Sequence, residues 1–127
     1  MLGYTTPMSF KKKLQNIRPS WRAVVMMWRE ELSFKLQILF GSLTIVASWV
    51  FQISKIEFLV VLLVIGAVLA IEALNTAIEE LCDHVTPSEH PKTGKVKDLG
   101  SAASGLIGIT ATVIGLIIFV PHLLLIL

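Results

Sequence analysis

The sequence has little charge and a single cysteine. Charged residues make up 16% of its 127 residues, and Cys82 is the one cysteine. A single cysteine excludes a disulfide within the chain, and we interpret it as a small packing residue near the end of a helix. The formal net charge of +2 is too small to indicate a nucleic-acid partner.

Several familiar catalytic motifs are also missing. The chain has no glycine-rich dinucleotide loop, no cluster of Cys and His, and no Ser/His/Asp set. Thr93-Gly94-Lys95 resembles part of a phosphate-binding loop, but Val96 follows it where that loop needs Ser or Thr. The basic run Lys11–Lys13 is not followed by an apolar segment, so we expect no N-terminal signal peptide.

What the sequence does have is apolar surface, arranged in long runs. Apolar residues make up 54% of the chain, more than a soluble domain of this size can bury. A transmembrane helix needs about 20 mostly apolar residues. We therefore predict an all-α membrane protein that forms a single domain over residues 1–127. Its transmembrane helices are expected over about 36–53, 58–81 and 101–127.

The segment before the first span has the pattern of a surface helix. Over about 9–34, Trp21 and Trp28 lie on an apolar stripe, whereas Arg22 and Arg29 fall elsewhere on the helix. This pattern is typical of an amphipathic helix in the membrane interface. It is equally consistent with a helix packed on the protein's own bundle.

The distribution of lysine and arginine predicts the topology. Basic residues gather before the first span and between the second and third, where a polar loop is expected from Asp83 to Asp98. Since positive residues stay on the cytoplasmic side, we expect a cytoplasmic N-terminus and second loop, and an external C-terminus. Small residues spaced by four, Ser101 with Gly105 and Ser104 with Gly108, predict a face for close helix packing. Three spans cannot easily surround a polar site, so we expect an oligomer.

The most informative feature is a polar stripe in the second span. The run from Phe58 to Ile71 is apolar throughout, but polar residues follow it. At about 100° per residue, one face of the helix carries Glu72, Asn75, Thr76, Glu79 and Asp83. Acids within a membrane span usually mark a functional site.

These residue types indicate a metal-bound anionic ligand beside a base. Glu72, the deepest acid, is expected to act as a general base, although it could instead only hold neighbouring helices together. Glu31 and Glu79 offer the carboxylates that Mg²⁺ favours alongside phosphates and waters. Lys97 and Asp98 lie at the entrance to the third span, where a polyphosphate with its metal would fit.

Two other classes of protein are compatible with parts of this pattern. A small oligomeric channel or ion-coupled carrier subunit could use Glu72 as an ion site, but would give no reason for Glu31, Glu79 and Lys97 to occur together. A membrane-shaping protein would account for the N-terminal helix and leave the stripe unexplained.

The motifs also resemble those of a known family. The segments Glu72–Glu79 and Lys97–Ala103, with Ser20–Phe34 ahead of them, are similar to the signature of the bacterial integral-membrane diacylglycerol kinases. The similarity covers nearly the whole chain from about Lys12. It implies a homotrimer in the bacterial inner membrane, with sites shared between chains. Such an enzyme transfers the γ-phosphate of MgATP to the primary hydroxyl of diacylglycerol, which gives phosphatidic acid. Undecaprenol kinase, which shares the central motif, is the alternative within the family.

The resemblance also implies a role for individual residues. Glu72 would be the catalytic base, and Glu31 and Glu79 would hold Mg²⁺. The implied ATP-binding residues are Lys12, Glu31, Glu79, Ser88, Glu89, His90, Lys97 and Asp98. The implied lipid-binding residues are Lys12, Ser20, Trp21, Phe34, Glu72, Asn75 and Ser101.

One position departs from the family pattern. Leu36-Gln37 stands where many relatives carry Gln-Glu, so the acid expected at Gln37 is absent. Any polarity of the lipid site that depends on that acid is therefore in question.

Overall fold

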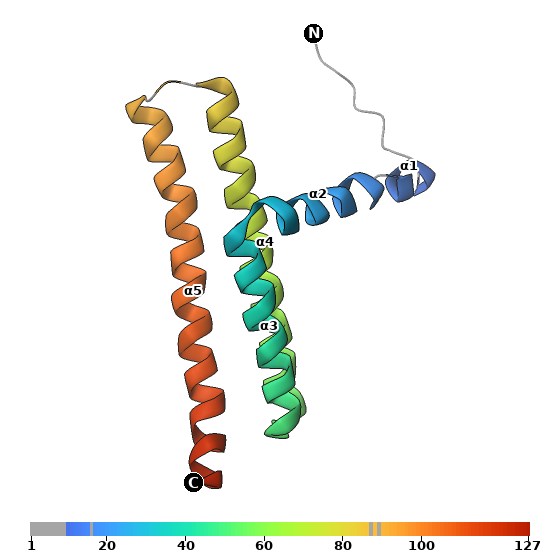
Figure 1. The fold of residues 1–127 in the computed structure, drawn as a ribbon, viewed down its shortest axis with the longest axis vertical. Helices are drawn as coiled ribbons and strands as arrows, with labels where there is room; N and C mark the ends of the chain where they lie inside the picture. The colour runs from blue at the N-terminus through green and yellow to red at the C-terminus, as the bar shows by residue number, and fades with distance from the viewer. Residues whose placement is uncertain (1–9, 16, 87, 89) are drawn as a thin grey trace. The chain divides into compact units, whose positions relative to one another are not determined.

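The computed structural model describes residues 10–15, 17–86, 88 and 90–127, and over these residues it is all-helical, as predicted (Figure 1). The helices are α1 (Phe10–Gln15), α2 (Ile17–Glu30), α3 (Leu32–Val50), α4 (Lys55–Val85) and α5 (Pro91–Ile126). The chain divides into two compact units, Met1–Lys35 and Leu36–Leu127.

The N-terminal unit contains the amphipathic segment. Helix α2 begins at Ile17 and includes Pro19 in its first turn, where a missing N–H removes no helical hydrogen bond. The expected surface helix over about 9–34 is therefore divided into α1, α2 and the start of α3. Trp21 is 67% exposed and Trp28 47%; a location of this segment in the membrane interface stays a prediction.

The C-terminal unit contains the long apolar helices. α3, α4 and α5 are each long and apolar enough to cross a membrane, which confirms the prediction of three spans. A tight turn joins α3 to α4, with Gln52 at a φ of 50°. Ser54 caps α4 through a reciprocal pair of hydrogen bonds with Glu57, each of 3.1 Å.

The connection between α4 and α5 is shorter than the polar loop expected from Asp83 to Asp98. α4 continues through Val85 and α5 begins at Pro91. Proline suits the first position of a helix because the N–H that it lacks would have no partner there. His90 caps this helix end, since its Nδ1 accepts a hydrogen bond of 3.2 Å from the N–H of Lys92.

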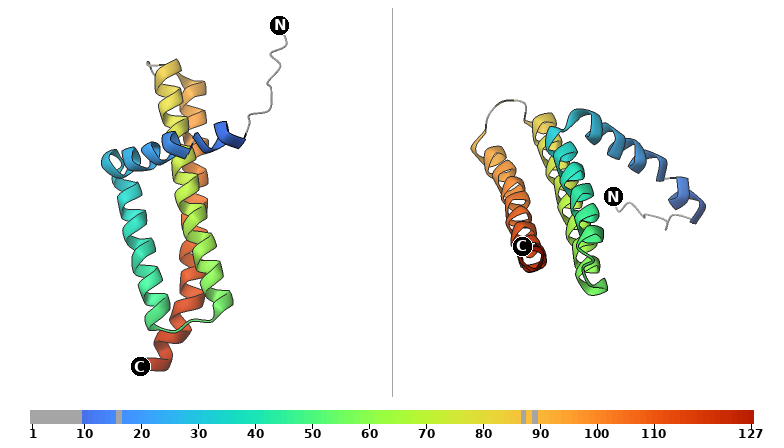
Figure 2. Two further views of the ribbon diagram at one scale, coloured as in Figure 1. Left: turned by 90° about the vertical axis from the view of Figure 1, so that its right-hand side faces the viewer. Right: turned by 60° about the horizontal axis from the view of Figure 1, so that its bottom comes forward.

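Helices α4 and α5 pack along one another (Figures 1 and 2). They approach closely at Gly100, where any Cβ would overlap the side-chain oxygen of Asn75. Gly41 has a similar role between α3 and α4, because a Cβ there would lie 3.2 Å from Cγ2 of Ile65. At the far end of the unit, the rings of Phe51 and Phe119 lie 6.2 Å apart.

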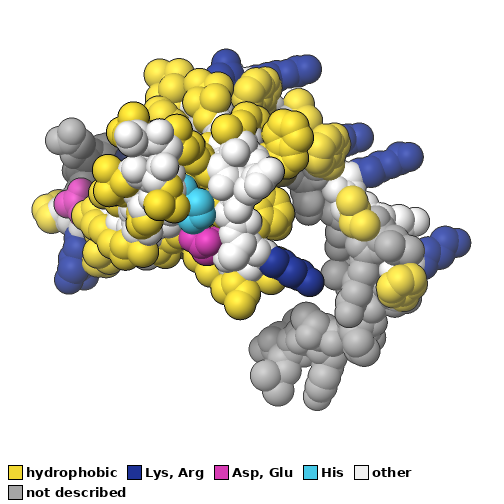
Figure 3. Space-filling model, turned by 90° about the horizontal axis from the view of Figure 1, so that it is seen from below, with side chains coloured by type: hydrophobic (Ala, Val, Ile, Leu, Met, Phe, Trp, Pro, Cys, Tyr) yellow, Lys and Arg dark blue, Asp and Glu magenta, His cyan; other side chains and the backbone are white. Residues whose placement is uncertain are grey.

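Most of the surface of these helices remains apolar. Hydrophobic side chains dominate the view along their axes (Figure 3), and Leu63 in α4 and Leu106 in α5 are 74% and 67% exposed. Such a surface matches a lipid surround. Ser101 and Gly105, one of the small-residue pairs expected to pack, are also exposed within the single chain.

Candidate active site

The Glu72 carboxylate lies where the three long helices meet. Its residue is only 8% exposed. Nε2 of Gln37, on α3, donates to Oε2 of Glu72 at 3.3 Å. Oγ of Ser104, on α5, donates to the same oxygen at 3.4 Å. Two neighbouring helices therefore donate to one oxygen of a carboxylate that α4 carries within a candidate membrane span.

A second carboxylate on the same face of α4 is held in a similar way. Nδ2 of Asn75 donates to Oε1 of Glu79 at 3.3 Å. Side chains four residues apart on a helix are neighbours, so this bond agrees with the stripe expected from the sequence. Thr76, on the same face, is 8% exposed.

This second pair has the chemistry of a hard-metal site. The Oδ1 atom of Asn75 is buried without a hydrogen-bond partner in the described part of the chain, and it packs against Gly100, where no Cβ would fit. Amide and carboxylate oxygens suit Mg²⁺. Over the described residues, no three His, Cys, Asp or Glu side chains gather into a group that could hold a metal. A metal at Asn75 and Glu79 would therefore need further ligands, such as the phosphates of a nucleotide.

A polar hollow of about 570 Å³ lies where α4 ends and α5 begins. Lys97 and Asp83 form an ion pair at its wall. Asp83, the last acid of the polar stripe, is therefore paired with a cation. The residues that line the hollow are Asp83, Thr86, Ser88, His90, Pro91, Thr93, Gly94 and Lys97.

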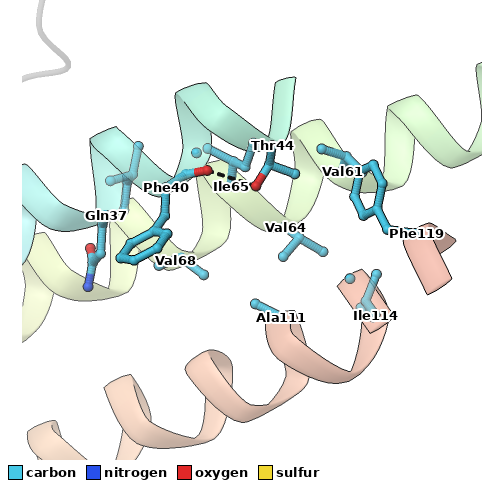
Figure 4. Close-up of a pocket in the computed structure, with 13 residues that line it drawn as sticks. Gln37, Phe40, Thr44, Val61, Val64, Ile65, Val68, Ala111, Ile114 and Phe119 are labelled. Atoms are coloured by element: carbon cyan, nitrogen blue, oxygen red, sulfur yellow. Dashed lines mark hydrogen bonds between the residues drawn. The ribbon is translucent and has the colours of Figure 1, made fainter. Parts of the chain in front are cut away.

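An apolar groove of about 230 Å³ runs between α3, α4 and α5 (Figure 4). Its walls are mostly aliphatic, with Val64 and Val68 from α4 and Ile114 from α5. Gln37 and Thr44 are its polar lining side chains, and the Thr44 hydroxyl donates to the backbone oxygen of Phe40 at 2.7 Å. Gln37 also donates to Glu72, so the buried carboxylate lies next to a residue that lines the groove.

The expected site residues fall into several places. Ser88, His90 and Lys97 share the polar hollow, whereas Asp98 and Ser101 are exposed on α5. The N-terminal unit carries Ser20, Trp21, Glu31 and Phe34, with Phe34 only 5% exposed. Glu89 and the side chain of Lys12 lie outside the part of the chain that the structure describes.

Sequence reasoning did not assign Gln37 and Ser104 to the site. Gln37 was identified only as a position where many relatives carry an acid, and Ser104 only as a small residue for helix packing. The signal for Gln37 was available, since a polar amide in an apolar span needs a partner. Nothing in the sequence distinguished Ser104 from Ser101, because choosing between them requires the rotation of α5 about its own axis.

A buried, hydrogen-bonded carboxylate beside an apolar groove, with a polar hollow at the helix ends, is an arrangement that suits a helical membrane enzyme. Residues 18–119 match the family model of prokaryotic diacylglycerol kinase. The chain belongs to this family, as the motifs suggested, and is therefore an ATP-dependent lipid kinase. The family also implies that ATP is used with a divalent metal.

Characterised relatives include kinases for two different lipids. The chain is 32% identical to undecaprenol kinase of Bacillus subtilis over 95 residues, which cover 75% of this chain and 77% of the relative. It is 27% identical to diacylglycerol kinase of Escherichia coli K12 over 103 residues, which cover 81% and 84%. Diacylglycerol kinase of Pseudomonas aeruginosa is 33% identical over 76 residues, which cover 60% and 62%.

Proposed function

We propose that this lipid kinase transfers the γ-phosphate of MgATP to the primary hydroxyl of diacylglycerol, which gives phosphatidic acid. The observation that carries this proposal is the buried Glu72 carboxylate, held by Gln37 and Ser104 at the end of an apolar groove. A base at this depth can meet a hydroxyl that never leaves the bilayer.

The reaction needs one proton transfer and one phosphoryl transfer. Glu72 takes the proton of the lipid hydroxyl as the lipid oxygen bonds to the γ-phosphorus. The bond from that phosphorus to the β,γ-bridging oxygen breaks, and its electron pair leaves with ADP. Phosphoryl transfer depends mainly on positioning and on the neutralisation of charge. A small helical site can supply both.

The nucleotide is proposed to bind at the polar hollow. Lys97 would neutralise phosphate charge, and Ser88 and His90 would contact the nucleotide at the same hollow. Glu79, together with Glu31 from the N-terminal unit, would hold Mg²⁺, which neutralises charge on the phosphates when bound. Along α4, the seven-residue step from Glu72 to Glu79 covers about 10 Å, which would separate the depth of the lipid hydroxyl from that of the phosphates.

The apolar groove is proposed to hold a hydrocarbon chain of the lipid. Its aliphatic walls suit a lipid chain, and its polar end at Gln37 lies against Glu72. A chain in the groove would therefore present the lipid hydroxyl to the base. Ser20, Trp21 and Phe34 would contact the lipid from the N-terminal unit, as Asn75 and Ser101 would from α4 and α5.

The protein is proposed to act as a homotrimer in the bacterial inner membrane, with sites shared between chains. Lysine and arginine are concentrated in the N-terminal unit and around the α4–α5 connection, which favours a cytoplasmic location for both. ATP would then reach the polar hollow directly. The exposed pair Ser101 and Gly105 is suited to packing against another chain.

Undecaprenol is the second candidate substrate. It is favoured by the similarity to undecaprenol kinase of Bacillus subtilis, at 32% identity. Both lipids present a primary hydroxyl on a hydrocarbon body, so the same base and groove could serve either one.

Phosphate transfer to the two lipids in parallel tests the proposal. Purified protein in mixed micelles with labelled ATP and magnesium is expected to label diacylglycerol faster than undecaprenol. Faster labelling of undecaprenol would transfer the proposal to the second substrate. If a folded, MgATP-binding sample labels neither lipid, both proposed substrates are wrong.

A further inference from the structure

The amide of Gln37 is hydrogen-bonded through its nitrogen but not through its oxygen. Its Nε2 donates to Oε2 of Glu72 at 3.3 Å. Its Oε1 is buried and has no hydrogen-bond partner in the described part of the chain. Buried acceptors are rarely left unpaired in native proteins, and each exception calls for an explanation.

The chemistry of the pair fixes which end of the amide faces Glu72. An ionised carboxylate can only accept hydrogen bonds, so the amide must present its N–H and leave its carbonyl oxygen without a partner. A protonated carboxyl group is different, because it carries an O–H donor of its own. The unpartnered oxygen is therefore suited to the state of Glu72 that exists after proton transfer.

We propose that Gln37 is a positioning residue that holds Glu72 both before and after it takes the proton of the lipid. In the resting site its N–H donates to the carboxylate. Once Glu72 is protonated, its O–H donates to the Gln37 carbonyl oxygen. This inference rests on the proposed function, in which Glu72 is the base.

The bonds balance in the step that Gln37 supports. The O–H bond of the lipid breaks and its proton goes to a carboxyl oxygen of Glu72. The lipid oxygen bonds to the γ-phosphorus, and ADP leaves with the electron pair of the broken P–O bond. The N–H and C=O of an amide lie in one planar group. An amide whose N–H donates to a carboxyl group can therefore also accept a hydrogen bond from that group through its C=O.

Several other side chains at position 37 would not support both states in this way. A lysine would donate to the carboxylate and offer no acceptor to the acid. A carboxylate would compete with Glu72 for the proton. Methionine would fill a similar space and make neither bond. A neutral side chain that both donates and accepts meets the requirement.

The test compares Gln37→Met with Ser48→Ala in the full-length protein, in mixed micelles with the lipid that the wild type labels. Ser48 is another buried polar side chain of α3, but its hydroxyl donates to the backbone oxygen of Thr44 and it does not line the groove. Gln37→Met is expected to lower kcat by about 10- to 100-fold, the range expected when one supporting polar contact is lost. The KM and Kd for MgATP should stay within about twofold of the wild-type values, and Ser48→Ala should keep a near-normal kcat.

A second variant distinguishes positioning from simple helix packing. Gln37→His also offers one donor and one acceptor when neutral, so it should recover most of the kcat that Gln37→Met loses. A Gln37→Met protein with normal kcat would overturn the inference. The inference would also be overturned if Gln37→Met lost MgATP binding together with its activity, or if the kcat of Gln37→His were no higher than that of Gln37→Met.

The same experiment separates this inference from the proposed function. If the wild type binds MgATP but labels no lipid, the proposed function fails and the role of Gln37 falls with it. If the wild type is active and Gln37→Met is equally active, Glu72 can still be the base and only the role of Gln37 is wrong.

Discussion

At the scale of single residues, the site is built from two similar amide–carboxylate pairs. Gln37 donates to Glu72, and Asn75 donates to Glu79. In both pairs the amide oxygen is buried and unpartnered within the described residues. In the proposed mechanism the Gln37–Glu72 pair serves proton transfer from the lipid, and the Asn75–Glu79 pair serves a metal ion on phosphates. The proposal thus divides the chemistry between two positions along α4.

The proposed role of Glu79 predicts a defect in nucleotide binding. Glu79→Gln removes a charged metal ligand, so it should weaken MgATP binding by about 10-fold or more. The neighbouring Glu80→Gln is a matched control, because Glu80 is exposed on the same helix. Isothermal titration of each detergent-solubilised variant with MgATP measures the effect. Equal affinities for the two variants would remove Glu79 from the metal site.

At the scale of helices, the register between α3, α4 and α5 creates the site. α4 supplies the carboxylates, while α3 and α5 supply the donors that hold Glu72. Glycines at Gly41 and Gly100 allow the close approaches on which this register depends. The same three helices form the apolar groove. Their packing therefore positions both Glu72 and the proposed path of the lipid chain.

Filling the groove should impair use of the lipid. Gly115 lines the groove and has no neighbour within 4 Å of the position of a Cβ. Gly115→Leu is therefore expected to raise the KM for the lipid by about 10-fold and to leave the KM for MgATP unchanged. Steady-state kinetics with each substrate varied in turn measures both constants.

Gly66→Leu is the matched control for this substitution. Gly66 is also without a neighbour within 4 Å, but it does not line the groove. If both leucine variants raise the KM for the lipid equally, the groove has no special role in binding the hydrocarbon chain of the lipid.

At the scale of the whole molecule, the sequence predicted the features that depend on local pattern. The apolar runs indicated three spans, and helical periodicity indicated that Glu72, Asn75 and Glu79 share a face. It could not predict that Gln37 and Ser104 meet Glu72, since these contacts depend on how separate helices rotate and slide. It also overestimated the polar connection after α4. Pro91 lies within that expected loop, whereas in the structure it begins α5.

Substitution of Glu72 tests the central claim most directly, because the account makes this residue the base of a lipid kinase. Turnover and MgATP binding would be measured on the same purified samples of wild type, Glu72→Gln and Glu80→Gln. We predict that Glu72→Gln lowers kcat by about 100-fold or more, as expected for loss of a general base, while MgATP binding is retained. Glu80→Gln should match the wild type in both measurements. A Glu72→Gln protein that still turns over normally, or one that loses MgATP binding instead of turnover, would contradict the account.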